Sequence, residues 1–246
     1  MRYVAVSGGA DSTALALLLW ERGEEFDLLF SDTGAELPEN YVLLHRLARR
    51  INRNLHVVSN GGFYEHLVRR NFMLPGIRIR WCTRELKMVP LDTFLAEHMA
   101  TEAAVGIRAD EPRRQTPENR SYANTKELRK HRWDVVHPLV EAGLGKDDVR
   151  ELCRRHGLLS PVYEWRSNVS CFCCPFQRKW DWKNLRVHHP ALYAVAEEWE
   201  KESKISAQQS WGWNSHYTLE GLRVMDEQQI SILPEPDEQP CLICTW

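Results

Sequence analysis

The sequence contains no long hydrophobic run, and this absence argues against a membrane protein. No stretch approaches the roughly 18 consecutive apolar residues that a membrane-spanning helix needs. The first residues also lack the charged, apolar and small-residue sections of a signal peptide, because residues 2–6 already have the pattern of a buried strand. We therefore expect a cytoplasmic protein that has no membrane partner.

The chain also lacks a large excess of positive or negative charge. The 246 residues include 32 Lys and Arg and 34 Asp and Glu, so the formal net charge is −2. The chain as a whole therefore carries no basic signal for nucleic-acid binding. Residues 120–132 are locally basic and could contact nucleic acid by charge, although a solvated surface loop is the preferred interpretation.

What the chain does contain is an alternation of strand-like and helical segments. Strands are expected at residues 2–6, 26–30, 55–58, 103–107 and 134–139, and helices at 12–22, from 38 onward, at 83–98 and at 146–156. Pro90 should interrupt or kink the helix that contains it. This order predicts an α/β fold with a doubly wound parallel sheet. It occupies residues 1–160, and a small C-terminal region rich in cysteine and tryptophan, helical and irregular, follows over 161–246.

The first strand leads directly into the string SGGADS, residues 7–12, which opens the first helix. Its glycines let the backbone approach an anion closely, and the helix N-terminus offers free N–H groups and the positive end of the helix dipole. The string lacks the Gly-Lys-Ser/Thr ending of a Walker A loop, so kinase-like and GTPase-like functions are disfavoured. The pattern predicts a loop that binds phosphate groups.

This loop resembles that of the PP-loop ATP pyrophosphatases. Four further strings resemble the branch that contains phosphoadenosine phosphosulfate (PAPS) reductases and DNA phosphorothioation sulfurtransferases. They are DTG with Glu36, WCTRELK with Pro90, GIRADE with Arg113, and C-x-x-C-P at residues 171–175. The chain lacks the C-terminal Glu-Cys-Gly-like motif of PAPS reductases, which makes sulfonucleotide reduction the weaker interpretation.

The resemblance implies an adenine nucleotide α-hydrolase-like fold that binds ATP with Mg²⁺. Asp32 and Thr33 would lie near the adenosine, at the carboxyl end of the second strand. Asp11, Lys87 and Arg108 are the candidate catalytic residues, and the two cations would stabilise phosphate charge. The implied nucleotide contacts are Ser7, Gly8, Gly9, Asp11, Ser12, Asp32, Thr33, Gly106, Arg108 and Arg113. For Arg113 a solvated surface charge is an equal alternative.

Seven cysteines are many for a cytoplasmic chain, where structural disulfides are rare. Two pairs have C-x-x-C spacing, Cys171 with Cys174 and Cys241 with Cys244. Such pairs indicate metal or cluster ligands or redox dithiols. Cys153 lies in an apolar helical pattern and is expected to be a buried residue without a ligand role.

The family resemblance adds Cys82 to Cys171 and Cys174 as a set of three cluster ligands. Three thiolates on a [4Fe–4S] cluster leave one iron open, and an open iron can hold a sulfide for transfer. Structural zinc is the alternative, because Zn²⁺ also accepts four thiolates. A fourth ligand, from Cys173, Cys241 or Cys244, is equally compatible with the sequence.

The leading hypothesis is an ATP-dependent, adenylating and pyrophosphate-releasing sulfurtransferase-like enzyme that uses an iron–sulfur cluster. Nucleic acid, a nucleotide or a small metabolite are all open as acceptors, and a sulfur-donor protein and a homodimer are open as partners. The alternatives are a PAPS reductase-like oxidoreductase and a nucleotide-binding sensor or regulatory subunit with structural zinc.

Overall fold

A parallel sheet of five strands forms the centre of the molecule. The computed structural model describes residues 1–76, 79–112 and 133–227. The strands are β1 (Arg2–Val6), β2 (Asp27–Ser31), β3 (Leu55–Val58), β4 (Glu102–Ala104) and β5 (Asp134–Val136). Their order is β3-β2-β1-β4-β5, and every neighbouring pair is parallel. The predicted α/β fold with a doubly wound parallel sheet is therefore confirmed.

The strand order reverses at β1, which pairs with β2 on one side and with β4 on the other. The connections after β1 and β4 therefore leave the sheet in opposite directions, and open α/β sheets bind ligands at such a point. Residues 7–12 follow β1, and Gly106 and Arg108 follow β4. The fold thus brings two of the sequence strings to the same edge of the sheet.

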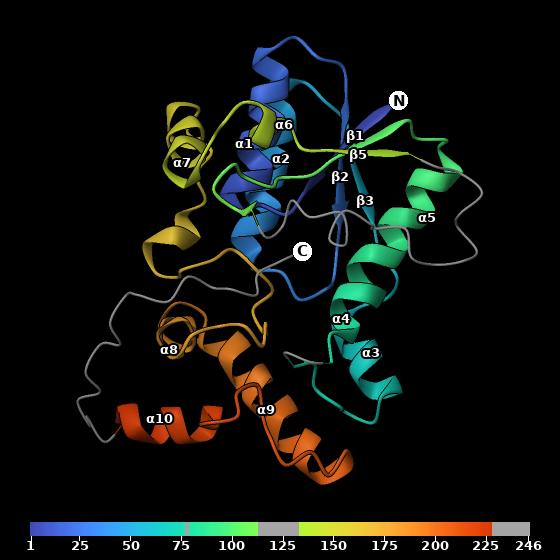
Figure 1. Ribbon diagram of the computed structural model, residues 1–246. Coiled ribbons are helices and arrows are strands. Elements are labelled where there is room, and N and C mark those ends of the chain that lie inside the picture. Colours follow the sequence, from blue (N-terminus) through green and yellow to red (C-terminus); the bar gives the residue numbers. More distant parts are fainter. Residues whose placement is uncertain (77–78, 113–132, 228–246) are drawn as a thin grey trace.

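Helices cover both faces of the sheet (Figure 1). On one face α1 (Ala10–Glu21) contacts β1, α2 (Pro38–Ile51) contacts β3, and α6 (Pro138–Glu141) and α7 (Lys146–Arg155) pack on α1. On the other face α5 (Val89–Glu97) contacts β2 and β3. The remaining helices are α3 (Phe63–Arg69), α4 (Trp81–Thr83), α8 (Lys179–His188), α9 (Pro190–Ser206) and α10 (Leu219–Glu227). Of these, α8, α9 and α10 pack together beyond the end of the sheet. No helix in these described residues is long and apolar enough to cross a membrane.

The fourth and fifth strands are shorter than the apolar pattern predicts. The expected strand at 103–107 ends at Ala104, where the N–H of Ile107 turns back to the carbonyl of Val105 at 2.8 Å. The expected strand at 134–139 ends at Val136 because Pro138 begins α6. In both segments the apolar residues continue past the strand since they still face the core.

Pro90 shapes the helix that contains it by forcing a π-helical segment, η1 (Arg84–Met88), between α4 and α5. Proline has no N–H, so the carbonyl of Leu86 loses its usual helical donor. The Ser31 hydroxyl donates to that carbonyl instead, at 2.6 Å, and the N–H of Val89 bonds to the carbonyl of Arg84. The predicted interruption is confirmed, and it ties η1 to the end of β2.

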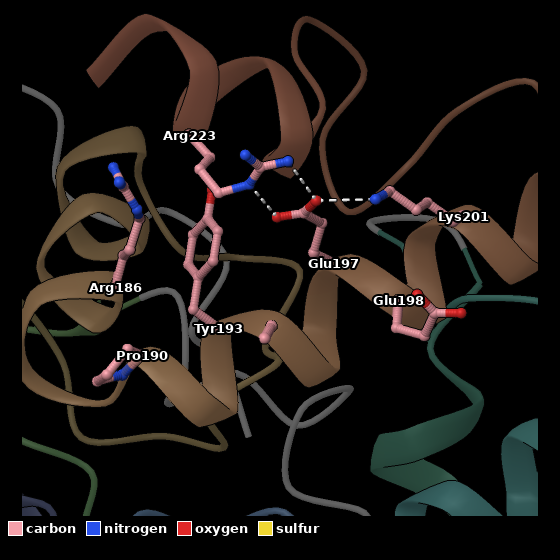
Figure 2. A pocket seen from close by; sticks show the side chains of 8 residues that line it. Arg186, Pro190, Tyr193, Glu197, Glu198, Lys201 and Arg223 are labelled. Carbon is pink, nitrogen blue, oxygen red and sulfur yellow. Dashed lines mark hydrogen bonds and ion pairs between the residues drawn. The ribbon is translucent and has the colours of Figure 1, made fainter. Parts of the chain in front are cut away.

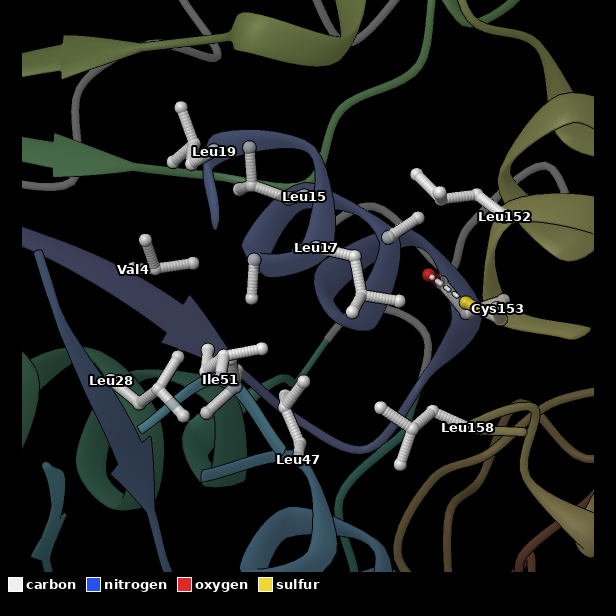
Figure 3. Packing of buried hydrophobic residues seen from close by; sticks show 14 of the residues in the cluster. Val4, Leu15, Leu17, Leu19, Leu28, Leu47, Ile51, Leu152, Cys153 and Leu158 are labelled. Carbon is white, nitrogen blue, oxygen red and sulfur yellow. Dashed lines mark hydrogen bonds between the residues drawn. The ribbon is translucent and has the colours of Figure 1, made fainter. Parts of the chain in front are cut away.

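The main core lies between the sheet and α1, α2 and α7 (Figure 3). The α1 residues Ala14, Leu15 and Leu17 are fully buried because α7 and α2 cover the side of α1 that faces away from the sheet. Cys153 belongs to this core, donates to the carbonyl of Ala10 at 3.4 Å, and has a pKa raised to about 12 by burial. Its predicted role as a buried apolar residue is confirmed.

A second core holds the C-terminal helices against α3 and α4. It unites Ala35, Phe63 and Trp81 with Phe172 and Trp199, so residues before and after position 160 share it. The carboxylate of Glu200 accepts hydrogen bonds from the N–H groups of Trp213 and Leu219 inside this region. Among the tryptophans of the C-terminal region, Trp182, Trp199 and Trp213 are buried, while Trp180 and Trp211 are 49% and 43% exposed.

Asp92 in α5 is a buried carboxyl group, so its ionisation should affect the stability of the fold. It is 3% exposed, and burial raises its pKa to about 7. Since the pKa is raised on folding, Asp92 favours the folded state fully below about pH 4 and progressively loses that contribution as the pH rises to 7. Replacing Asp92 by Asn should therefore raise the free energy of unfolding at pH 8 by about 1–3 kcal/mol and change it little at pH 4.

Urea unfolding at both pH values measures this difference, with exposed Asp147 replaced by Asn as the control. An equal effect of the Asp92 substitution at pH 4 and pH 8 would contradict the assignment.

Candidate active site

The predicted phosphate loop has the backbone shape that anion binding requires. Gly8 has φ +77°, and a Cβ atom there would lie 3.2 Å from the side chain of Asn40. Gly9 is the N-cap of α1, so the first turn of the helix points its N–H groups at the loop. The Ser12 hydroxyl accepts from the N–H of Ser7 and donates to the carbonyl of Gly9, both at 3.1 Å. These bonds hold the loop in place without any bound ligand.

Gly106 brings the segment after β4 into contact with this loop. A Cβ atom at Gly106 would lie 2.9 Å from the backbone carbon of Asp11 and 2.9 Å from the nitrogen of Ser12. Any side chain there would displace the first turn of α1. Glycine is thus required at this position because two backbone segments touch.

Arg108 connects the same segment to the loop through its charge. Its guanidinium bonds to the carboxylates of Asp11 at 2.7 Å and Asp110 at 2.8 Å, and lies 3.6 Å from that of Glu111. Burial lowers the pKa of Arg108, but the Asp11 carboxylate and its neighbours raise it above the usual value overall. Asp11 and Arg108, two of the three candidate catalytic residues, therefore form an ion pair beside the predicted phosphate loop.

Polar groups also gather at the carboxyl end of β2. The Asp32 carboxylate accepts from the N–H of Gly34 and from the hydroxyl of Tyr41, at 2.8 and 2.7 Å. The Thr33 hydroxyl donates to Glu36 at 3.1 Å. Thr33 is 1% exposed, while Asp32 retains partial exposure. Of the two residues expected near the adenosine, only Asp32 reaches the surface.

Asn40 connects this end of β2 with the phosphate loop. Its amide nitrogen donates to Glu36 at 2.9 Å, and its side chain packs on Gly8. Its Oδ1 atom is buried and accepts no hydrogen bond among the described residues. An acceptor is therefore free beside the loop. Asn40 carried no motif signal, because an asparagine in the first turn of a predicted helix is unremarkable by sequence.

The cysteine loop, residues 171–174, packs against the polar side chains at the carboxyl end of β2. The N–H of Phe172 bonds to the carbonyl of Ala35 at 2.8 Å, which fixes the loop against the segment after β2. The Cys171 thiol then lies 3.3 Å from the Thr33 hydroxyl and 3.3 Å from the Glu36 carboxylate. Residues 138 positions apart in sequence are thus in contact at the candidate nucleotide edge.

Four cysteines lie close enough to influence one another. Cys171 and Cys173 are buried, and Cys82 and Cys174 are partly exposed. Burial raises the pKa of Cys82, Cys171 and Cys173, and the neighbouring cysteines raise it further. As free thiols, Cys82, Cys171 and Cys173 are therefore protonated at neutral pH and are weak nucleophiles.

Two cations border the cysteines. Lys87 lies on η1, and interaction with Cys171 and then with Glu36 raises its pKa although burial opposes this. Arg166 is 1% exposed and donates to the carbonyls of Ser170 and Cys171 at 3.1 and 3.0 Å, and burial lowers its pKa. Both charges would offset negative thiolates. Arg166 was not identified from the sequence, because it lies five positions before Cys171 and outside the C-x-x-C string.

The donor types here fit a thiolate-bound metal ion or iron–sulfur cluster, since soft thiols lie beside charges that compensate them. Among residues 1–76, 79–112 and 133–227, however, no three Cys, His, Asp or Glu side chains converge on a common metal position. The contacts of Cys171 with Thr33 and Glu36 are those of a free thiol. Arg113, Cys241 and Cys244 lie outside the described residues, as does the basic segment 120–132.

A surface groove of about 340 Å³ lies elsewhere, between α8, α9 and α10 (Figure 2). Glu197 in this groove bonds to Arg223 and Lys201. The bond to Arg223 is the largest cause that lowers the pKa of Glu197, and the bond to Lys201 lowers it further. Glu197 is thus paired with two of the basic side chains that line the groove. None of its lining residues belongs to the motifs that the sequence predicts.

A parallel sheet with a glycine-rich phosphate loop at its switch point defines a nucleotide-binding α/β protein. Residues 2–165 match the phosphoadenosine phosphosulfate reductase domain family, which is more than half of the 246 residues. The chain therefore belongs to this family, within the PP-loop adenine nucleotide α-hydrolase superfamily. The resemblance inferred from the motifs is confirmed.

Two curated proteins of Methanocaldococcus jannaschii, both described as uncharacterized, are similar in sequence. MJ0066 is 26% identical over 207 residues, which covers 80% of this chain and 40% of the relative. MJ0973 is 22% identical over 188 residues, which covers 76% of this chain and 44% of the relative. The chain thus spans less than half the length of these relatives.

Several solved structures share parts of the architecture. A PAPS reductase from Candida auris in complex with phosphate has a TM-score of 0.49 at 15% identity, over 66% of this chain and 76% of that one. An NMN synthetase from Francisella tularensis has a TM-score of 0.45 at 16% identity, over 96% and 89%. Both scores lie below 0.5, so the family assignment rests on the sequence match alone.

Proposed function

We propose that this protein is an ATP-dependent adenylating transferase that moves sulfur to an activated acceptor. The observation that carries the proposal is the contact of Cys171 with Thr33, 3.3 Å apart. Thr33 directly follows Asp32 at the end of β2, on the sheet edge that also holds the phosphate loop. Nucleotide chemistry and sulfur chemistry would then share one site.

The phosphate loop supports the nucleotide half of this proposal. Ser7, Ser12 and the backbone of Gly8 and Gly9 would bind the phosphates of ATP with Mg²⁺. Arg108, held beside Asp11, and Lys87, held beside Glu36, would stabilise charge on the phosphates as pyrophosphate leaves. Preorganised cations of this kind act through position and require no proton transfer.

The reaction would proceed in two displacements. An acceptor oxygen forms a bond to the α-phosphorus of ATP, the bond to the β-phosphate oxygen breaks, and pyrophosphate leaves with that electron pair. A sulfur nucleophile then attacks the adenylated acceptor, and AMP leaves with the electrons of the bond that is broken. Protons from the acceptor and the sulfur pass to solvent.

A metal group would act beside this edge if the cysteines hold one. Cys82, Cys171 and Cys174 would be its ligands, with Cys173 as a fourth candidate, and Lys87 would offset the thiolate charge. A bound iron–sulfur cluster would supply sulfide for the transfer, whereas zinc would hold the loop in place.

Metal content tests this assignment through cysteine variants. Anaerobically purified wild-type protein should contain iron and acid-labile sulfide in nearly equal amounts. Replacement of Cys82, Cys171 or Cys174 by Ala should abolish both, because each removes one ligand. Cys153→Ala is the matched control, since Cys153 lies in the main core, and it should retain the wild-type content.

Stoichiometric zinc without sulfide would contradict the cluster and favour a structural metal. Iron that persists in all three variants would show that these cysteines are not its ligands.

Membership of the PAPS reductase domain family favours a second candidate, a reductase acting on a sulfonucleotide. It requires a nucleophilic thiolate, for which the C-terminal candidates are Cys241 and Cys244, and both lie outside the described residues. Release of pyrophosphate from ATP in the presence of an acceptor supports the transferase. Release of sulfite from PAPS with a thiol donor would establish the reductase instead.

A further inference from the structure

Tyr163 reaches the phosphate loop from a distant part of the chain. It lies on the 3₁₀ segment η4 (Pro161–Glu164), which follows α7 and precedes the cysteine loop. Its hydroxyl oxygen accepts a hydrogen bond from the N–H of Ala10 at 2.9 Å. Ala10 is the first residue of α1, so the phenol occupies one of the N–H groups that the loop presents to anions.

The ring of Tyr163 is held firmly in this position. The guanidinium of Arg150 on α7 lies 5.2 Å from the ring centroid, and the ring packs against the main core. The hydroxyl also lies 3.8 Å from where a Cβ atom at Gly9 would stand. The phenol is therefore positioned at the loop by contacts that do not depend on a ligand.

The hydroxyl proton of Tyr163 remains available for a ligand. A phenol can accept one hydrogen bond and donate another. The oxygen accepts from Ala10, and no acceptor for its proton lies within hydrogen-bonding distance among the described residues. Burial raises the pKa of Tyr163 to about 12, so the proton stays on the oxygen at neutral pH. The group next to the loop is thus a neutral donor.

We propose that Tyr163 is a phosphate-binding residue of this site, whose hydroxyl donates its hydrogen bond to the pyrophosphate part of the nucleotide while it accepts from Ala10. This rests on the proposed ATP-binding function. The phenol thereby links the helix N–H to the anion, because its oxygen accepts from Ala10 while its O–H donates to the phosphate. Tyr163 also lies shortly before Arg166, which donates to the carbonyl of Cys171.

Binding of inorganic pyrophosphate and of ATP to the Tyr163→Phe variant tests the proposal by titration calorimetry. The variant keeps the ring and loses only the hydroxyl. Both ligands should bind about tenfold more weakly, as expected for the loss of one hydrogen bond to a charged acceptor. Adenosine, which carries no phosphate, should bind to the variant and to the wild type equally.

Tyr193→Phe is the matched control, because it removes a buried phenol hydroxyl that bonds to the carbonyl of Leu219, away from the loop. It should leave pyrophosphate affinity unchanged, and thermal unfolding verifies that both variants are folded. Unchanged or tighter pyrophosphate binding by Tyr163→Phe would overturn the proposal, with tighter binding showing that the phenol competes with phosphate for Ala10. Failure of the wild-type protein to bind ATP or pyrophosphate would instead overturn the proposed function.

Discussion

Replacing Arg108 by Ala should weaken ATP binding by about 10- to 100-fold, the largest effect expected of any charge at this site. The substitution leaves the carboxylates of Asp11, Asp110 and Glu111 without their shared cation. Those negative charges lie beside the loop that must accept phosphate, so they would repel the nucleotide. Titration calorimetry with ATP measures the loss.

Two further variants separate charge from geometry. Arg108→Lys keeps the positive charge but not the planar fork, and should fall between Ala and wild type. Arg223→Ala breaks the paired contact with Glu197 in the distant groove and should leave ATP affinity unchanged. An Arg108→Ala protein that is folded and binds ATP within twofold of wild type would contradict a role for Arg108 at the phosphates.

Replacing Gly106 by Ala should cost both stability and nucleotide binding. The new Cβ atom would lie 2.9 Å from the backbone of Asp11 and of Ser12, and neither backbone can move without displacing α1 or the loop. Overpacking of this kind costs about 1–3 kcal/mol. We expect that loss in urea unfolding, together with ATP binding at least tenfold weaker, since the displaced atoms belong to the phosphate loop.

Gly62→Ala serves as the control, because a Cβ atom at Gly62 meets nothing within 4 Å and its φ of −83° suits alanine. That variant should match the wild type in both measurements. If Gly106→Ala binds ATP normally while losing stability, Gly106 supports only the packing of α1.

The motif after β1 was readable because it depends on local backbone geometry, whereas the string after β4 was recognised through the family resemblance. A strand followed by two glycines and a helix start can be recognised without any knowledge of the rest of the molecule. Pro90 is a similar case, since the missing N–H must disturb the helix wherever it lies. The sequence could not show that Ser31 would satisfy the carbonyl that Pro90 leaves without a donor.

The ends of the strands and the partners of the charged residues were harder to predict. Apolar residues continue beyond Ala104 and Val136 because they stay in the core after the strand ends, so the pattern overestimates both strands. Arg108 was expected at the phosphates, and its ion pair with Asp11 spans 97 positions in sequence. No local pattern reports a contact of that length.

The sequence by itself determined three things: the sheet class through its alternating segments, the phosphate loop through residue types at short spacing, and the family through the resemblance of its motifs. Tertiary structure alone decided that Tyr163 reaches Ala10, that Cys171 meets Thr33 and Glu36, and that Gly106 touches α1. Each of these contacts joins segments that the chain brings together only when the parallel strands align their carboxyl ends at one edge. Local chemical features can be predicted from the residue types, whereas contacts between distant residues depend on how the strands and helices pack.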